Sequence, residues 1–198
     1  SDALRGRTVL VEGVGAVGAP LAERLAEAGA TLLVADLDAA RAAAVADRLD
    51  GTAISAAAVG STACDVYAPC AVGATLDEET VPRLRCSIVA GAANNQLATP
   101  EMADALHARG ILYAPDYVIN GGGAMAVTSI YLGVDDLDEL DRRVRGIGAA
   151  LDGIFEEASR RGSSPVVAAQ AHVARVLQRG PRDGGEALRA GRPRPRDP

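Results

Sequence analysis

Residues 8–18 read TVLVEGVGAVG, and they carry the strongest indication of the architecture. The first half of this stretch is a short apolar run rich in β-branched residues, which predicts a buried parallel strand over residues 8–12. Three glycines come next at the spacing G-x-G-x-x-G: Gly13 permits a tight turn, Gly15 lets the backbone approach a pyrophosphate, and Gly18 lets a helix pack close to the strand. A turn of this kind can also bind nothing, so its meaning depends on the residues after it in the chain.

Strand and helix patterns alternate after this turn. A helical pattern over residues 16–28 ends at Gly29, a second apolar strand covers 31–35, and Asp38 is suited to cap an Ala-rich helix that runs to about residue 49. This alternation predicts an α/β protein with a Rossmann-type, doubly wound, mostly parallel sheet of about six strands and C-terminal helices. Further strands are expected near 53–54, 65–69, 87–91 and 111–113, and further helices near 100–109, 124–131, 137–160 and 165–177.

The same patterns divide the chain into three parts. Residues 1–134 are expected to form a dinucleotide-binding domain, and residues 135–179 a group of C-terminal helices. Residues 180–198, GPRDGGEALRAGRPRPRDP, lack apolar periodicity and are expected to be disordered.

Composition excludes several classes of function. The net charge of −6 gives no basic surface for nucleic acid, and no apolar run approaches the roughly 20 residues that span a bilayer. The first residues carry no signal-peptide pattern, and Cys64, Cys70 and Cys86 have no metal-ligand spacing, so we expect reduced thiols in a cytoplasmic protein without a metal site. All 20 basic residues are Arg, which makes a poor general base.

An acidic residue lies beyond the glycine turn at the expected distance. Asp36 lies 23 positions after Gly13, at the end of the second predicted strand, where a carboxylate accepts hydrogen bonds from the adenosine ribose. Its charge repels a 2′-phosphate, so the sequence favours NAD over NADP, and Arg41 is interpreted as a solvated residue of the next helix. Val14, Ala16 and Val17 complete the predicted cofactor-binding turn.

Three downstream stretches carry a family resemblance: CDVYAPCAVGATL at 64–76, IVAGAANNQL at 88–97 and GILYAPDYVINGGG at 110–123. Together they strongly resemble the nucleotide-binding half of the leucine, valine and phenylalanine dehydrogenases of the glutamate dehydrogenase superfamily. The resemblance begins at LRGRTVLVEGVGAVG and runs to about residue 178. It implies NAD-dependent oxidation of an L-amino acid to a 2-oxo acid and ammonia, by an enzyme that is a homo-oligomer with a small-molecule substrate and no nucleic-acid or membrane partner.

The resemblance also implies roles for single residues at the cofactor. Cys70 and Ala71 match the loop that lines the adenosine side, although a small buried thiol at Cys70 is explained equally well by packing. Asn94 matches an amide that reaches towards the nicotinamide ribose and the substrate, and Asn120 matches a residue near the nicotinamide carboxamide. Without these motifs, an Asn in a loop indicates only a turn.

Two further positions match residues that touch the substrate side chain in this family. Ala124 and Val127 are small and apolar, which suits an aliphatic or aromatic side chain and not a carboxylate. The stretch YAPDYVIN favours a branched-chain substrate, whereas Ala124 leaves room for an aromatic ring. Leucine, valine and phenylalanine therefore all remain open.

The chain departs from the family pattern in several places. Glu12 stands where the family usually has Gln, Ala16 replaces a frequent Asn, and Gly121 replaces a usual Ala. The family's catalytic residues, two lysines and an aspartate, belong to a preceding domain against which the C-terminal helices are expected to pack. This chain contains no Lys, so we expect it to carry no catalytic residue and to bind NADH without turnover.

Two other functions are compatible with part of this pattern. A non-enzymatic NAD-binding module, or a degenerate paralogue, would share the glycine turn and would also lack the lysines. Another two-domain Rossmann dehydrogenase, such as a shikimate-type enzyme, is disfavoured by AANNQL together with YAPDYVIN.

Overall fold

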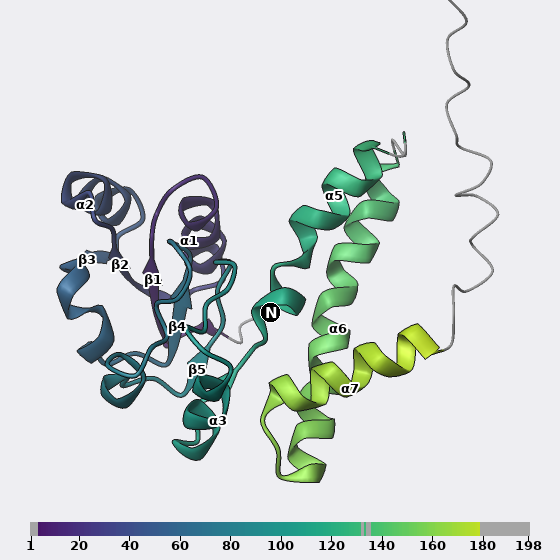
Figure 1. Ribbon diagram of the computed structural model, residues 1–198. Coiled ribbons are helices and arrows are strands. Elements are labelled where there is room, and N and C mark those ends of the chain that lie inside the picture. Colours follow the sequence, from purple (N-terminus) through teal and green to yellow (C-terminus); the bar gives the residue numbers. More distant parts are fainter. Residues whose placement is uncertain (1–3, 132, 134–135, 179–198) are drawn as a thin grey trace, which may run out of the picture.

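The computed structural model describes residues 4–131, 133 and 136–178, and its centre is a six-stranded sheet (Figure 1). The strand order is β3-β2-β1-β4-β5-β6, and every neighbouring pair is parallel. The chain starts in the middle of the sheet, builds one half outwards and then returns to build the other half. This doubly wound order confirms the predicted Rossmann-type fold.

Strand length falls from the centre of the sheet towards its edges. The longest strands are β1, at the centre, and its neighbour β2, which both match the predicted bounds, and the strands β3, β5 and β6 are only two residues long. Apolar side chains alternate between the two faces of β1: Leu10 packs into one core cluster, whereas Val9 and Val11 pack into the other. The strands are β1 Thr8–Glu12, β2 Thr31–Ala35, β3 Thr52–Ala53, β4 Val66–Pro69, β5 Ile88–Val89 and β6 Leu112–Tyr113.

Helices connect these strands. The Asp38 carboxylate accepts hydrogen bonds from the Ala40 and Arg41 amides at 3.1 Å, so the predicted cap of the second helix is confirmed. The connecting helices are α1 Gly18–Glu27, α2 Ala39–Arg48 and α3 Glu101–Ala108, with short 3₁₀ turns at η2 Ala56–Ser61 and η3 Val81–Arg83.

The C-terminal helices form a group of their own beside the sheet (Figure 1). They are α4 Asp116–Ile119, α5 Gly121–Tyr131, α6 Leu137–Arg161 and α7 Pro165–Gln178. Helix α6 packs against α4, α5 and α7. Two local expectations were wrong: α4 was not predicted, and α5 begins at Gly121 instead of residue 124, because neighbouring helices hold three glycines of low intrinsic propensity in helical form.

The predicted boundary between residues 134 and 135 and the predicted tail at 180–198 both lie outside the described residues. Within the part of the chain that is described, no helix is both long enough and apolar enough to cross a membrane.

Candidate functional site

A cavity of about 240 Å³ opens at the carboxyl ends of β1, β2 and β4. In a doubly wound sheet this edge, where the strand order reverses, is the place at which ligands bind. The cavity brings together six residues from three separate stretches of sequence, of which all but Glu12 were predicted to bind a cofactor: Glu12, Gly13, Gly15, Asp36, Cys70 and Ala71.

The glycine loop, residues 13–18, is closed at its two ends and open in its middle. Gly13 has a positive φ of 86°, and a Cβ there would lie 2.7 Å from the backbone of Ala71. A Cβ at Gly18 would overlap the carbonyl oxygen of Gly13, so this glycine is required for the close contact of α1 with the loop. A Cβ at Gly15 would meet no described atom within 4 Å, which leaves this backbone accessible from the cavity.

The start of α1 is suited to an anion. Within the described residues no side chain caps this helix, and its first turn contains no acidic residue. Ala19 already donates its amide to the Gly15 carbonyl at 3.1 Å, and Pro20 has no N–H. This end of the helix therefore offers a negatively charged group the Gly18 amide and the positive end of the helix dipole. Ala16 and Val17, which were predicted to contact a cofactor, are exposed at this point.

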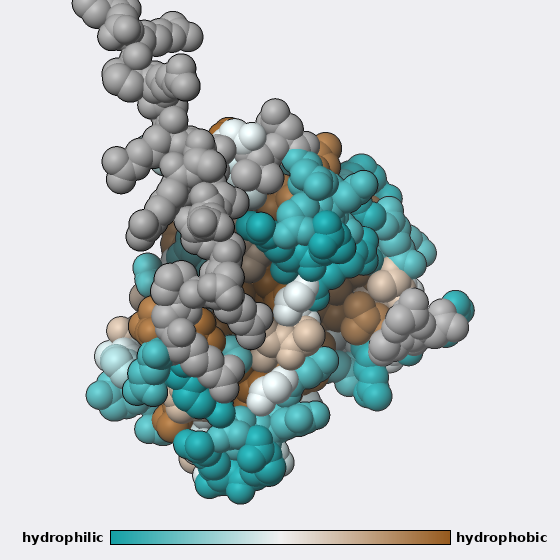
Figure 2. Space-filling view, turned by 90° about the vertical axis from the view of Figure 1, so that its right-hand side faces the viewer, coloured by the Kyte–Doolittle hydropathy of each residue, from teal (hydrophilic) through white to brown (hydrophobic). Residues whose placement is uncertain are grey.

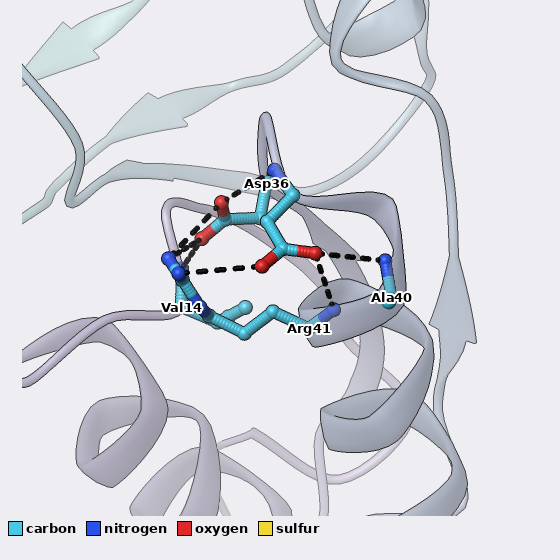
Figure 3. A network of polar contacts seen from close by, with 5 residues as sticks. Val14, Asp36, Ala40 and Arg41 are labelled. Carbon is cyan, nitrogen blue, oxygen red and sulfur yellow. Dashed lines mark hydrogen bonds and ion pairs between the residues drawn. The ribbon is translucent and has the colours of Figure 1, made fainter.

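Asp36 is held in place by the glycine loop and by the next helix (Figure 3). Its carboxylate accepts hydrogen bonds from the Val14 amide at 3.0 Å and from the Asp38 amide at 2.9 Å, and it pairs with Arg41 at 3.4 Å. Burial acts to raise the pKa of Asp36, but these two amides and the Arg41 guanidinium outweigh it and lower the pKa below its ordinary value of 3.8. The carboxylate is therefore ionised at neutral pH.

Arg41 is partly solvated and also forms ion pairs. Its side chain is half exposed on α2, as the sequence predicted, and it also contacts the carboxylates of Asp36 and Asp38. Its guanidinium lies beside the same cavity as Asp36.

Glu12 places a second carboxylate at the cavity, where it accepts a hydrogen bond from the hydroxyl of Tyr67. Burial raises the pKa of Tyr67, and the neighbouring Glu12 charge raises it further, so the phenol keeps its proton and remains a donor. Burial likewise raises the pKa of the Cys70 thiol. Cys70 therefore contributes a neutral wall to the cavity, in agreement with the packing interpretation.

A second group of polar residues lies after β5 and α4. The Asn120 amide donates a hydrogen bond of 2.6 Å to the side-chain oxygen of Asn94, so two residues that are 26 positions apart in the sequence are brought together. Gln96 stabilises the loop after β5: it is fully buried, and its side-chain amide donates to the carbonyls of Gly91 and Ala93 at 2.9 Å. Asp116 accepts the Gln96 backbone amide at 3.2 Å. The sequence did not predict a role for Gln96 or Asp116, because their side chains bond backbone groups, which no motif identifies. Both residues nevertheless lie in the motifs that carry the family resemblance.

The two predicted substrate residues do not join the hydrogen-bonded pair Asn94 and Asn120. Ala124 and Val127 lie on α5, where both are exposed, and no described contact joins them to Asn94 or Asn120. Apolar residues reach the surface on the side of the molecule shown in Figure 2. Near them a cavity of about 570 Å³, lined in part by Tyr117, Met125 and Ile147, opens between α4, α5, α6 and α7.

The sequence did not predict part of the first cavity's wall. Leu37, Ala56 and Val72 line it, and Leu37 and Val72 are 91% and 73% exposed. The sequence did contain a signal for Leu37 and Val72: each is a large apolar residue two or three positions beyond the end of a buried strand, where a polar turn residue is the usual choice.

The fold, the glycine loop and the cavity together define a Rossmann-type protein whose site lies at the carboxyl ends of the strands. Comparison with known proteins narrows this class. The family model Glutamate/Leucine/Phenylalanine/Valine dehydrogenase matches residues 36–139, just over half of the chain, and the chain belongs to this family.

Individual relatives agree with the family. The chain is 36% identical over 191 residues to leucine dehydrogenase of Bacillus subtilis, a match that covers 96% of this chain and 52% of the relative. It is 41% identical over 169 residues to valine dehydrogenase of Streptomyces albus, with 84% and 46% covered. The crystal structure of L-tryptophan dehydrogenase from Nostoc punctiforme matches with a TM-score of 0.83 at 38% identity, over 86% of this chain and 52% of that one. The chain thus spans about half the length of the relatives it matches.

Proposed function

We propose that this chain is the NAD-binding part of an L-amino-acid dehydrogenase that converts a branched-chain or aromatic amino acid to a 2-oxo acid, ammonia and NADH. The observation that carries the proposal is the Asp36 carboxylate, fixed by the Val14 amide of the glycine loop at the edge of the first cavity. A dinucleotide suits this arrangement, with its ribose hydroxyls at Asp36 and its pyrophosphate at Gly15 and the start of α1.

The other proposed contacts continue along the cofactor towards the substrate. Cys70 and Ala71 would line the adenosine side, and the Asn94–Asn120 pair would orient the nicotinamide and its ribose. When bound, NAD supplies the hydride acceptor; this chain's residues bind and orient it. Ala124 and Val127 would contribute an apolar part of the substrate wall, and the family's members that act on leucine, valine and tryptophan are consistent with an apolar side chain.

Catalysis requires more than this chain provides. The general bases available to an amino-acid dehydrogenase at neutral pH include lysines of depressed pKa, and these 198 residues contain no Lys. We therefore propose that the lysine-bearing catalytic part, against which residues 135–179 would pack, lies on another segment of a cytoplasmic, homo-oligomeric enzyme. Residues 1–134 would then form the cofactor domain.

A titration of the purified chain with NADH tests the binding site. Asp36→Ala is expected to weaken NADH binding about 10-fold or more, because hydrogen bonds to a charged acceptor are worth roughly 1.5–3 kcal/mol. Asp47→Ala is the matched control, since it removes an exposed carboxylate from α2 that does not line the cavity, and its affinity should equal that of the wild type. Equal affinities for wild type and Asp36→Ala would contradict the proposed site.

Absorbance at the NADH band tests whether catalysis requires residues outside this chain. The chain with NAD and leucine, valine or phenylalanine should produce no NADH, whereas turnover would reveal a base within these residues.

The rival function, a non-enzymatic NAD-binding module or a degenerate paralogue, shares the Asp36 site but not the lysines. Reading the coding sequence upstream of Ser1 separates the two: a glycine-rich Lys segment in the same frame supports the dehydrogenase, and a start codon at this point supports the module.

A further inference from the structure

Two cysteines face each other at the amino ends of β4 and β5. Cys64 lies just before β4 and Cys86 just before β5, and the amide of Cys64 donates to the carbonyl of Arg85 at 3.1 Å. The parallel register pairs Ala63 with Arg85 and continues with Val66 opposite Ile88. Cys64 and Cys86 are therefore direct neighbours on adjacent strands.

The two side chains are in contact and remain accessible. The two thiols interact, because each shifts the pKa of the other, upward at Cys64 and downward at Cys86. Both thiols are free, partly exposed, and packed at the margin of the larger core cluster. Neighbouring strands lie about 4.8 Å apart, which is within the roughly 4.4–6.8 Å between the Cα atoms of disulfide-bonded cysteines. A bond between the sulfurs therefore does not require the strands to separate.

The surroundings give the two thiols different reactivity. The interaction with Cys64 lowers the pKa of Cys86, and the nearby Arg109 guanidinium lowers it further, whereas the interaction with Cys86 raises the pKa of Cys64. Arg109 is held in place because it donates to the backbone carbonyls of Val81 and of Leu84, the latter at 2.8 Å. Cys86 is thus suited to be the attacking thiolate, and Cys64 to be the thiol that resolves the product.

We propose that Cys64 and Cys86 form a redox-active dithiol, which a peroxide oxidises to an intrachain disulfide. The Cys86 thiolate attacks one oxygen of hydrogen peroxide, the O–O bond breaks, and the products are a sulfenic acid and hydroxide, which takes up a proton to become water. The Cys64 sulfur then attacks the sulfenyl sulfur and the S–O bond breaks. The hydroxyl leaves as a second water with the Cys64 proton. Both sulfurs are oxidised, and both peroxide oxygens are reduced.

This site is separate from the proposed cofactor site. The first cavity lies at the carboxyl ends of the strands, where Cys70 comes after β4, whereas Cys64 precedes the same strand. Six residues of extended chain place these two positions roughly 20 Å apart. The proposal therefore does not depend on NAD binding, and Cys70 serves as the internal control.

Mass spectrometry of the reduced chain after treatment with a small excess of hydrogen peroxide tests the proposal. Remaining thiols are alkylated before digestion without a reductant. The expected result is a pair of linked peptides that contain Cys64 and Cys86, an alkylated Cys70, and reversal by dithiothreitol. The proposal is overturned by oxidation of Cys70 at the same rate, by disulfides only between chains, or by unchanged thiols under conditions that oxidise free glutathione.

Single variants test the order of the steps. Cys64→Ser should accumulate a sulfenic acid at Cys86 that dimedone traps, and Cys86→Ser should slow oxidation of Cys64 about 10-fold or more. Cys70→Ser should form the Cys64–Cys86 link at the wild-type rate. Oxidation of Cys64 at an unchanged rate in Cys86→Ser would overturn the assignment of the attacking thiol. Circular dichroism checks that each variant folds. The peptide map of the wild type tests the proposal even if a variant does not fold.

Discussion

The two ends of the candidate site differ in how much of their surroundings this chain supplies. At the first end, the glycine loop and Asp36 are fixed by hydrogen bonds and close contacts that all come from β1, β2, β4 and the helices between them. At the second end, Asn94 is exposed, and α5 turns Val127, Ile130 and Tyr131 to the surface with 68%, 77% and 88% of their area exposed.

Under the function proposed above, this difference makes holding a cofactor and assembling a reaction centre separable tasks. The first end is complete because the groups that hold the glycine loop and Asp36 all belong to this chain and lie close together in the fold. The second end carries apolar surface of the kind that marks a site of further contact. Its completion by another segment of the protein is a consequence of the function proposed above, and three measurements can test whether the two ends differ in this way.

The largest effect is expected from two glycine variants of the loop. Gly18→Ala should lower the free energy of unfolding by about 2 kcal/mol, because the new Cβ would overlap the Gly13 carbonyl oxygen and force the backbone to move. Gly15→Ala should change the stability by less than about 0.5 kcal/mol, because its Cβ meets no described atom within 4 Å, yet it should weaken NADH binding. Urea unfolding and NADH titration measure both. If Gly15→Ala binds NADH like the wild type, the open middle of the loop is not where the cofactor approaches.

A smaller effect is expected at Glu12. Glu12→Gln removes a negative charge from the wall of the first cavity while it keeps an oxygen to accept the Tyr67 hydroxyl. NADH should bind about fivefold more tightly, equivalent to about 1 kcal/mol, because repulsion of the pyrophosphate is relieved. The gain should shrink as salt is added, since mobile ions screen the same repulsion. Glu23→Gln, a change at a half-exposed residue of α1 that pairs with Arg48, is the control and should leave the affinity unchanged. Weaker binding by Glu12→Gln would show that the carboxylate assists the ligand.

The smallest effect is expected at the second end. ADP-ribose lacks the nicotinamide, and it should bind this chain within about threefold of NADH, because the exposed Asn94–Asn120 pair offers few fixed contacts. Asn120→Ala should remove most of that difference by weakening NADH binding and leaving ADP-ribose binding unchanged. Competition titrations measure both ligands. A preference for NADH that is much larger than threefold would mean that the second end is already complete in this chain.

Local sequence patterns were reliable where local interactions decide the structure. The bounds of β1 and β2 were predicted correctly, because short apolar runs bounded by turn signals leave few alternatives. The Asp38 cap was also predicted, since a cap depends only on residues two and three positions away. The expected strand over 87–91 is shorter in the structure, at Ile88–Val89, because its pairing with β4 and with β6 extends over these two residues alone.

The amino-acid sequence was enough to establish the fold class, the family and the residues that deserve attention at the site. The tertiary structure was needed to establish which of those residues meet: Glu12 with Tyr67, Asn94 with Asn120, and Cys64 with Cys86. The members of each pair are more than 20 positions apart, and each pair depends on which strands become neighbours. The physical reason is that hydrophobic periodicity and turn chemistry act over a few residues, whereas a pair across the sheet forms only after strand order and register have been set by burial of the whole core.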